Sequence, residues 1–375
     1  MKKIIVINYT GRKGGGAVDA FETSKALAEQ GANVVPIISK RIENLETWKA
    51  FGFEKLIVLE TYHNKLSFVL NSLLFCFRQK KQIKKAIKSY DVECVYCPMS
   101  TFWTYRINKI FGHSLKIIVN HDPVPHSGAN KLSVYLMERP FKKADIVIVH
   151  SKKFLDFVTN KYKKVEYFPL GPHNVYKSVP NKKTIVEYNS NKINFVFFGR
   201  ITAYKGLDLL AKAYKLLSVE HDKSVSLTIV GNGDFKAYES LYKDLPNCKI
   251  INRWILDEEV ESVFTGNNLV SVCPYKDGTQ SGVVLVSYEY GIPVIASRTG
   301  GIEEQVFDNK TGFLIEANNL EQLVNSMEKF VNQPTLIKSM QNNISFYLES
   351  ISWSKSAEHL LNIIRDSKKS LGKTD

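Results

Sequence analysis

The chain has 375 residues, 44% of them apolar and 23% charged, with no biased tract. This length and composition exclude a disordered or fibrous protein and predict about two packed domains. No apolar run approaches the roughly 20 residues of a membrane-spanning helix, and the run IIVIN after Met1-Lys2-Lys3 is too short for a signal peptide. We therefore expect a cytoplasmic protein.

The positive charge lies in the first half of the chain. Residues 1–170 hold 28 Lys and Arg against 14 Asp and Glu, which accounts for the whole formal net charge of +14. An excess of this size predicts an anionic partner. Because no RNA-stacking motif or DNA-reading helix pattern is present, we expect no nucleic acid and favour a membrane surface, with a phosphorylated substrate as the alternative.

Strand-like runs alternate with helical patterns along the whole chain, which is typical of parallel sheets with crossover helices. The predicted strands are residues 3–8, 34–38, 56–59, 92–97, 117–120 and 146–150, and then 195–198, 226–230, 249–252, 269–273, 294–296 and 313–315. This pattern predicts an α/β fold with two doubly wound domains. Their predicted limits are 1–170 and 194–350, with a linker at 171–193 and a last helical segment at 351–375.

The first glycine-rich loop follows the first predicted strand. Gly14, Gly15 and Gly16 precede a helical pattern at 17–29, and glycine at such a place lets backbone N–H groups approach a ligand. The spacing does not match the Gly-x-Gly-x-x-Gly dinucleotide fingerprint. The alternative is a tight turn without a ligand.

Residues 66–88 read LSFVLNSLLFCFRQKKQIKKAIK, a dense apolar run followed by six cations. Such a segment is typical of a helix that lies on an anionic bilayer with its cations at the headgroups. The alternative is a crossover helix with a solvated basic face. The charge of the first half favours the membrane.

Two short motifs in the first half contain chemically active side chains. The loop HDPVPH after strand 117–120 places His121, Asp122 and His126 at a strand's carboxyl end, where they suit catalysis or acceptor binding; a structural role is the alternative. Cys94 and Cys97 lie inside a predicted strand with no second pair or His cluster nearby. We therefore interpret them as core thiols and expect no metal.

The stretch FVFFGRITAYKGLDLL, residues 195–210, predicts a buried strand followed by a helix that begins near Gly206. Arg200 and Lys205 then lie at the carboxyl end of a parallel strand, where open α/β sheets bind ligands. A planar guanidinium and an ammonium suit a diphosphate. The alternative is two solvated surface cations.

Two further turns in the second half lead from a strand into a helix. Residues 277–282 combine small residues, hydroxyls and a glycine at a helix start, which can form an anion cradle. Residues 299–304 form a similar turn. Ordinary helix capping is the alternative for each.

Four motifs occur in order along the second half: FGRITAYKGLDLL, PYKDGTQSGVVLVSYEYGIPVIAS, TGGIEE and DNKTGFLIE. Together they resemble the donor-binding half of family 4 (group 1) glycosyltransferases, and the loops of the first half resemble those of transferases that make bacterial surface polysaccharides. The resemblance implies the GT-B fold, two facing Rossmann-like domains, with the helix in 351–375 packing back on the first domain.

The resemblance also implies roles for single residues. Arg200 and Lys205 would bind the diphosphate of a nucleotide-sugar donor and replace a metal, so that no cofactor is needed. Gly15 and Gly16 would approach the same diphosphate, and His121 would face the transferred sugar. The other implied donor residues are Trp254, Thr279, Gln280, Ser281, Gly282 and Val283. The residues implied for the acceptor are Asp122 and His126.

The implied activity is retaining transfer of a hexose or N-acetylhexosamine, most simply from a UDP-sugar, to a lipid-diphosphate-linked saccharide. The setting would be O-antigen, capsule or exopolysaccharide assembly at the inner face of the plasma membrane. Alternatives are a nucleotide-sugar 2-epimerase of the same fold and an inactive partner protein in a synthase complex. The paired glutamates of many relatives fall on Gly278 and Val286 here, so the ribose must be held in another way.

Overall fold

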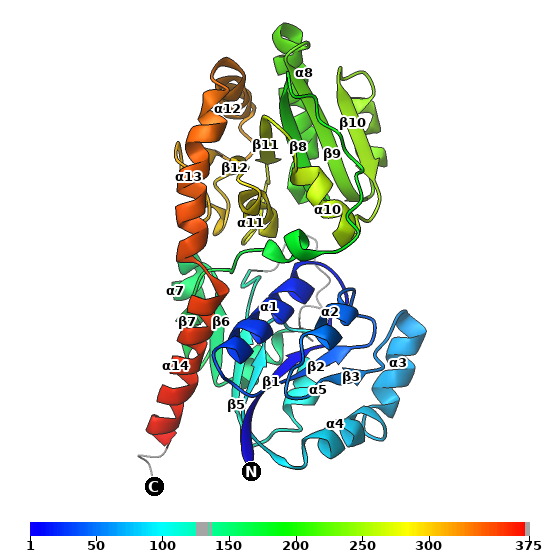
Figure 1. Cartoon of the computed structure of the whole chain (residues 1–375), viewed down its shortest axis with the longest axis vertical. Helices are drawn as coiled ribbons and strands as arrows, with labels where there is room; N and C mark the ends of the chain where they lie inside the picture. The colour runs from blue at the N-terminus through cyan, green and yellow to red at the C-terminus, as the bar shows by residue number, and fades with distance from the viewer. Residues whose placement is uncertain (125–134, 136, 372–375) are drawn as a thin grey trace. The chain divides into compact units, whose positions relative to one another are not determined.

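The computed structural model describes residues 1–124, 135 and 137–371 of the chain. The chain divides into two compact units (Figure 1). Unit 1 comprises Met1–Gly171 and Ser352–Asp375, and unit 2 comprises Pro172–Ile351. Each unit is built around one parallel sheet, which confirms the predicted α/β class with two doubly wound sheets.

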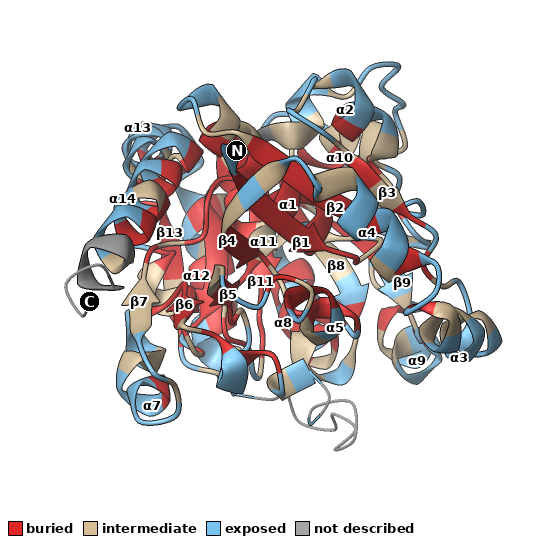
Figure 2. Cartoon of the chain, turned by 90° about the horizontal axis from the view of Figure 1, so that it is seen from below, coloured by how far each residue is buried: buried red, intermediate tan, exposed pale blue. Residues whose placement is uncertain are grey.

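The sheet of unit 1 has seven parallel strands in the order β3-β2-β1-β4-β5-β6-β7. The strands are β1 (Lys2–Tyr9), β2 (Val34–Ser39), β3 (Ile57–Leu59), β4 (Tyr90–Cys97), β5 (Leu115–Val119), β6 (Ile146–Val149) and β7 (Val165–Tyr167). The six predicted strands are confirmed. Strand β7 was not predicted; it is a three-residue edge strand whose residues are only half-buried, whereas Figure 2 shows the central strands buried.

The helices of unit 1 are α1 (Gly15–Glu29), α2 (Leu45–Ala50), α3 (Lys65–Leu74), α4 (Gln79–Ile87), α5 (Thr104–Asn108), α7 (Leu155–Thr159) and α14 (Trp353–Leu371). Two 3-10 helices, η1 (Phe141–Lys143) and η2 (Lys152–Phe154), flank β6. Cys94 and Cys97 are buried, free thiols on β4, as predicted. None of the described helices is long and apolar enough to cross a bilayer.

Helix α14 belongs to unit 1 although it comes last in the chain. It packs on α1, and its apolar side joins residues of β1 and β5 in one buried cluster. Its residues in that cluster are Trp353, Ala357, Leu360, Ile363 and Ile364. Gly171 makes room for the indole, because a Cβ at Gly171 would lie 2.6 Å from the Trp353 ring.

Residues 66–88 form two helices rather than one. The Asn64 side chain caps α3 by accepting a hydrogen bond from the Ser67 N–H at 2.8 Å. The chain turns after Leu74, and α4 follows. Phe75 and Ile83 are buried and fix this turn and α4 to the unit, whereas no residue of α3 itself is buried.

The sheet of unit 2 has six parallel strands in the order β10-β9-β8-β11-β12-β13. They are β8 (Ile193–Ile201), β9 (Val225–Gly233), β10 (Cys248–Asn252), β11 (Leu269–Cys273), β12 (Val294–Ser297) and β13 (Gly312–Ile315). All six were predicted, but β8 and β9 are longer than expected. They stay paired through Gly199 and Gly231, where a Cβ on Gly231 would lie 1.7 Å from the Gly199 carbonyl oxygen.

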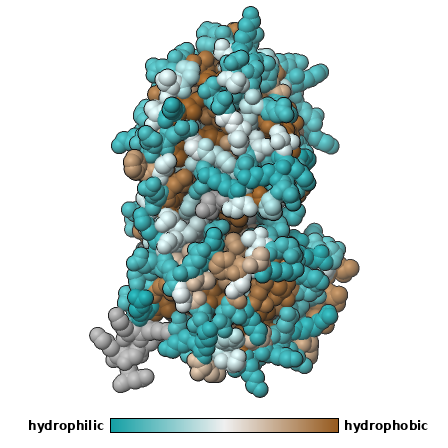
Figure 3. Space-filling view, viewed as in Figure 1, coloured by the Kyte–Doolittle hydropathy of each residue, from teal (hydrophilic) through white to brown (hydrophobic). Residues whose placement is uncertain are grey.

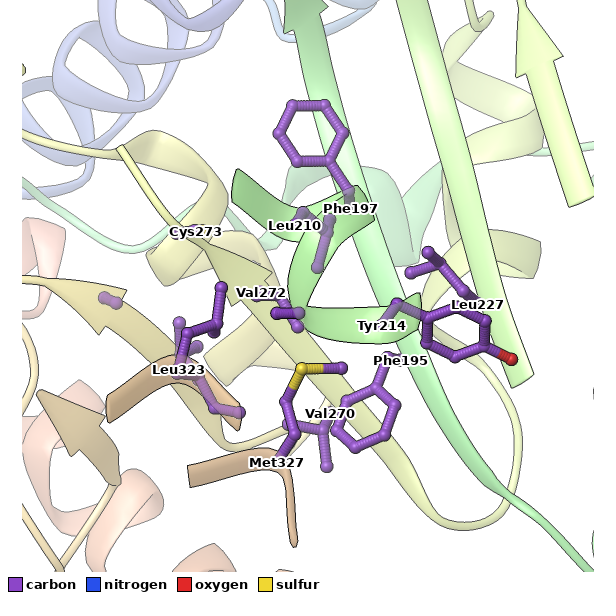
Figure 4. Close-up of a cluster of buried hydrophobic side chains, with 14 of the residues drawn as sticks. Phe195, Phe197, Leu210, Tyr214, Leu227, Val270, Val272, Cys273, Leu323 and Met327 are labelled. Atoms are coloured by element: carbon purple, nitrogen blue, oxygen red, sulfur yellow. The ribbon is translucent and has the colours of Figure 1, made fainter. Parts of the chain in front are cut away.

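The α-helices of unit 2 are α8 (Leu207–His221), α9 (Glu239–Tyr242), α10 (Asp257–Phe264), α11 (Gly282–Glu289), α12 (Leu320–Asn332) and α13 (Thr335–Ser350). The 3-10 helices are η3 (Asn174–Ser178), η4 (Ala203–Lys205), η5 (Lys236–Tyr238) and η6 (Ile302–Glu304). The buried side of α8 includes Leu210 and Tyr214 and lies in the core cluster with Phe195, Phe197, Leu323 and Met327 (Figure 4). This packing fixes the start of α8 beside the end of β8.

Candidate functional site

The carboxyl edge of the unit 2 sheet presents Arg200. It is the second-last residue of β8, it is exposed, and it pairs in register with Asn232 of β9. Within the described residues Arg200 has no ion-pair partner. Its guanidinium is therefore free to bind an anion at the end of the strand, as the sequence predicted for a ligand site.

Lys205 lies at the end of η4, directly before α8. Its Nζ is 3.5 Å from the centre of the Tyr275 ring, which is a cation–π contact. The next residue, Gly206, has φ +71°, and a Cβ there would lie 1.9 Å from the Pro274 carbonyl oxygen. Glycine at this position is what lets the loop after β8 pack against the loop after β11 and brings Lys205 to Tyr275.

The loop between β11 and α11 is held from behind by the turn after β12. The Ser281 N–H donates to the Gln305 side-chain oxygen at 2.8 Å, and the Gln305 amide donates to the Ser281 carbonyl at 3.3 Å. The Gly301 N–H donates to the Thr279 carbonyl at 2.7 Å. The two turns that the sequence analysis treated separately thus form one assembly.

This assembly ends at the N-terminus of α11, whose first N–H groups have no partner within the helix. Residues Thr279 to Val283 therefore surround a position that favours negative charge. The Lys276 ammonium pairs with Asp208 at 2.7 Å. Burial raises the pKa of Asp208, but the hydrogen bond and charge of Lys276 and the backbone N–H groups of Asp208 and Leu209 together outweigh it, so the pKa is lowered overall. The negative charge of Asp208 is thus balanced by Lys276. Arg200 and Lys205 therefore leave a net positive charge at this edge.

Three of the buried polar atoms that have no hydrogen-bond partner among the described residues lie in the loops of this edge. They are Thr202 Oγ1, Gln280 Oε1 and Thr299 Oγ1. They lie in the loops after β8, β11 and β12, which are neighbouring strands in the sheet. A buried polar atom left unpaired costs about 1–3 kcal/mol, so three of them at one edge indicate a site that a polar ligand completes.

The positions at which relatives have glutamates do not present carboxylates here. Val286 is buried in an apolar cluster with Val196 and Phe264. Glu289, one turn further along α11, forms an ion pair with Lys177 at 3.4 Å. Burial raises the pKa of Glu289 although Lys177 opposes that shift. Glu289 is therefore engaged within unit 2 and does not replace the missing glutamate.

Arg253 and Trp254, the second of which is an implied donor residue, directly follow β10. Arg253 forms two hydrogen bonds to the Glu259 carboxylate, at 2.7 and 2.8 Å, and these lower the pKa of Glu259. This pair fixes the start of α10 and occupies the guanidinium. Trp254 is 36% exposed and remains the candidate for stacking on a base.

The glycine-rich loop of unit 1 begins α1. Gly14 has φ +82° and donates its N–H to the Glu43 carboxylate at 2.6 Å. Gly15 is exposed at the first turn of the helix, as a ligand-binding backbone requires. Gly16 is buried, and a Cβ there would lie 2.6 Å from Met99 Sδ. Close packing is thus one reason for glycine at position 16, and its predicted approach to the diphosphate stays a prediction.

His121 follows β5 at the carboxyl edge of the unit 1 sheet. Its Nε2 lies 3.1 Å from Asp19 Oδ2 and 2.7 Å from the Pro98 carbonyl oxygen. Burial lowers the pKa of His121, but the hydrogen bond and charge of Asp19, the Pro98 carbonyl and the charge of Asp122 outweigh it and raise the pKa. The His150 ring packs edge-on against His121 at a centroid distance of 4.8 Å.

Among the described residues, Asp19, His121 and His150 form the group of potential metal ligands, with ligand atoms within 4.8 Å of one another. Two acceptors already face Nε2 of His121, so this nitrogen carries a proton and the group is a hydrogen-bonded cluster. Asp122 is exposed beside His121. His126, predicted to bind the acceptor, lies outside the described residues.

Comparison with known proteins adds to this geometry. Residues 179–347 match the family described as "Glycosyl transferases group 1". An uncharacterized glycosyltransferase of Methanocaldococcus jannaschii is 27% identical over 329 residues, which cover 84% of this chain and 78% of that protein. The second half of the chain is therefore similar to group 1 glycosyltransferases. Further relatives match over about half of their length; for the D-inositol 3-phosphate glycosyltransferase of Corynebacterium aurimucosum, 24% identical, the match covers 45% of this chain and 42% of that protein.

Solved structures show the fold. Sucrose-phosphate synthase from Thermosynechococcus elongatus has a TM-score of 0.73 at 16% identity, covering 99% of this chain and all of that one. Anabaena HepE in complex with UDP and glucose has a TM-score of 0.72 at 12% identity, covering 98% and 100%. WaaG, a glycosyltransferase involved in lipopolysaccharide biosynthesis, has a TM-score of 0.63 at 16% identity, covering 96% and 99%. The chain therefore has the GT-B fold of these proteins.

Several residues at these edges were not predicted from the sequence. Tyr275 contacts Lys205, Gln305 holds Ser281, and Asp19 pairs with His121. His173 lies beside the start of α11, because a Cβ on Gly282 would be 3.3 Å from its Nε2. Tyr275 lies inside a predicted motif, Gln305 directly follows another, and Asp19 lies three residues after the glycine-rich loop. The sequence did not indicate what these side chains contact, since their partners are far away along the chain.

Proposed function

We propose that this enzyme is a retaining, metal-independent glycosyltransferase that uses a nucleotide sugar. It moves a hexose or N-acetylhexosamine from a UDP-sugar to a lipid-diphosphate-linked saccharide in surface-polysaccharide assembly. The observation that carries the proposal is the unit 2 edge at which unpaired Arg200 and loop-fixed Lys205 lie with the start of α11. Their charges suit the donor diphosphate, which becomes the leaving group.

In the proposed reaction the bond between the sugar's anomeric carbon and the diphosphate oxygen breaks. The acceptor hydroxyl attacks the same face of the sugar, and its proton passes to the departing phosphate oxygen. The arrangement requires no nucleophile from the protein. Arg200, Lys205 and the α11 N–H groups stabilise the negative charge that grows on the leaving diphosphate.

A neighbouring solved structure and several side chains of this chain support UDP as the nucleotide of the donor. HepE, which resembles this chain in fold, was solved with UDP and glucose. In this chain Trp254 offers an exposed ring for a base, and the unpaired Thr202, Gln280 and Thr299 atoms offer partners for ribose or phosphate oxygens. These three loops would replace the absent glutamate in holding the ribose.

The lipid acceptor is supported by the surface of α3 and α4. Leu66 is 78% exposed, Leu73 70% and Phe77 69%, and Figure 3 shows hydrophobic residues at the border of unit 1 where Figure 1 draws α3. Exposed lysines of α4 directly follow this apolar stretch along the chain. We therefore assign α3 and α4 to the anionic membrane surface in which the acceptor lipid is anchored.

Binding of UDP tests the donor site directly. We expect UDP and a UDP-sugar to raise the melting temperature of the wild-type protein. Arg200→Ala and Lys205→Ala should each lower the rate of transfer by roughly 100-fold or more, as loss of a charged contact to a leaving group does. Lys212→Ala, an exposed cation of α8, is the matched control and should change neither quantity.

Wild-type rates in both site variants would overturn the assignment. Incubation with the nucleotide sugar alone distinguishes the rivals, because a 2-epimerase converts its substrate without an acceptor. A protein that neither binds UDP nor cleaves the donor would instead be the inactive partner.

A further inference from the structure

Asp19 is a buried carboxylate in the second turn of α1, on the side of the helix that faces the ends of β4 and β5. Its side chain is 4% exposed, and its Oδ2 lies 3.1 Å from His121 Nε2. The same nitrogen lies 2.7 Å from the Pro98 carbonyl oxygen. Both groups are acceptors, so the hydrogen on Nε2 is fixed by two partners from different elements.

The ring of His121 is also held from the side. The His150 ring packs against it at a centroid distance of 4.8 Å and an interplanar angle of 65°. His150 is itself oriented, because its Nδ1 lies 2.9 Å from the Phe168 carbonyl oxygen. The His121 side chain is nevertheless 16% exposed, so part of the ring can meet a ligand.

The charges around the pair favour a cationic ring. Asp19 from α1 and Asp122 from the loop after β5 act on His121, while His150 packs on it from the end of β6. Tyr9 on β1 and Tyr96 on β4 also face Asp19. Burial raises the pKa of both phenols first, and the Asp19 charge adds to this, so both stay neutral.

We propose that Asp19 is the positioning residue of His121. Its carboxylate holds the Nε2 proton, so that the other ring nitrogen, Nδ1, is the one presented to a substrate oxygen. Nδ1 then forms a hydrogen bond with a hydroxyl of the sugar or acceptor at the unit 1 edge. The expected effect on the transfer rate rests on the proposed function, whereas the Asp19–His121 hydrogen bond does not depend on it.

The substitution Asp19→Asn tests the proposal because it keeps the shape and removes the charge. Nitrogen-15 NMR of histidine-labelled protein, recorded without substrate, reports the protonation of both ring nitrogens of His121, and His121→Gln assigns the signal. We expect the pKa of His121 to fall in Asp19→Asn. We further expect kcat to fall at least about tenfold with the donor KM little changed, because an orienting carboxylate acts through the histidine.

Two further variants separate positioning from folding. Asp19→Glu restores the carboxylate and should recover part of the kcat and of the His121 pKa. Glu29→Gln, an exposed acid at the end of the same helix, should behave as wild type. If Asp19→Asn leaves the His121 titration unchanged, or if kcat falls only together with the melting temperature, the proposal is wrong.

Metal analysis supplies the remaining outcome. Stoichiometric zinc in the purified protein, with loss of activity on chelation, would overturn the proposal in favour of an Asp19–His121–His150 metal site. If the NMR shift occurs but the wild-type protein transfers no sugar, the proposed function fails while the Asp19–His121 pairing stands.

Discussion

Gly206 offers a test of how the donor loop is built. Its φ of +71° costs a residue with a Cβ about 1–2 kcal/mol. In addition, an alanine Cβ would lie 1.9 Å from the Pro274 carbonyl oxygen, far below the 3.0 Å that real contacts respect. Relieving such an overlap typically costs a further 1–3 kcal/mol. We therefore expect Gly206→Ala to lower the free energy of unfolding by about 2–5 kcal/mol.

Gly291 is the matched control in the same unit. Its φ is +69°, but the nearest atom to an added Cβ is 3.5 Å away on the flexible Gln341 side chain. Gly291→Ala should therefore cost only the backbone strain of about 1–2 kcal/mol. Urea unfolding of both variants measures the difference. Equal losses would refute the reasoning, because the contact with Pro274 would then carry no energy. Gly206→Ala should also weaken UDP binding, since Lys205 would move from Tyr275.

Three other predictions concern unit 1. Leu73→Asp should weaken binding to anionic vesicles without changing the melting temperature, because Leu73 is 70% exposed; unchanged binding in a vesicle sedimentation assay would remove α3 from the membrane surface. Trp353→Ala should lower the free energy of unfolding by about 3–5 kcal/mol, and a loss under 1 kcal/mol would mean that α14 does not stabilise unit 1. The pKa of folded His121 is raised above 6.5, so its stabilising effect, measured against His121→Gln, should be fully present below about pH 6.5 and decline as pH rises through the folded-state pKa. An effect that grows with pH would contradict the assigned ion pair with Asp19.

The strand pattern was readable from the sequence because buried parallel strands are continuous apolar runs. Strand β7 was missed because an edge strand of three half-buried residues has no such run. The positions of Arg200 and Lys205 followed from the rule that ligands bind at the carboxyl ends of strands. Local sequence therefore predicts where a side chain leaves the sheet.

Local sequence does not predict what that side chain meets. The partner of His121 is Asp19 on α1. Four strands and four α-helices lie between α1 and His121 along the chain, and no spacing rule connects the two residues. Arg253 follows a strand end, much as Arg200 lies near the end of β8, yet Glu259 occupies the Arg253 guanidinium. Gly16 and Gly206 both lie at helix starts, but an added Cβ would meet the Met99 side chain at Gly16 and the Pro274 carbonyl oxygen at Gly206. These differences depend on tertiary packing.

The late position of α14 in the chain has a consequence for biosynthesis. Residues 1–171 emerge from the ribosome first, yet the apolar surface that Trp353, Leu360 and Ile364 cover stays bare until the last helix is made. At the usual 5–20 residues per second, translation of the intervening segment takes roughly 10–40 s. During this interval the nascent amino-terminal half exposes an apolar surface that favours aggregation. Chaperone binding to this surface would prevent that aggregation.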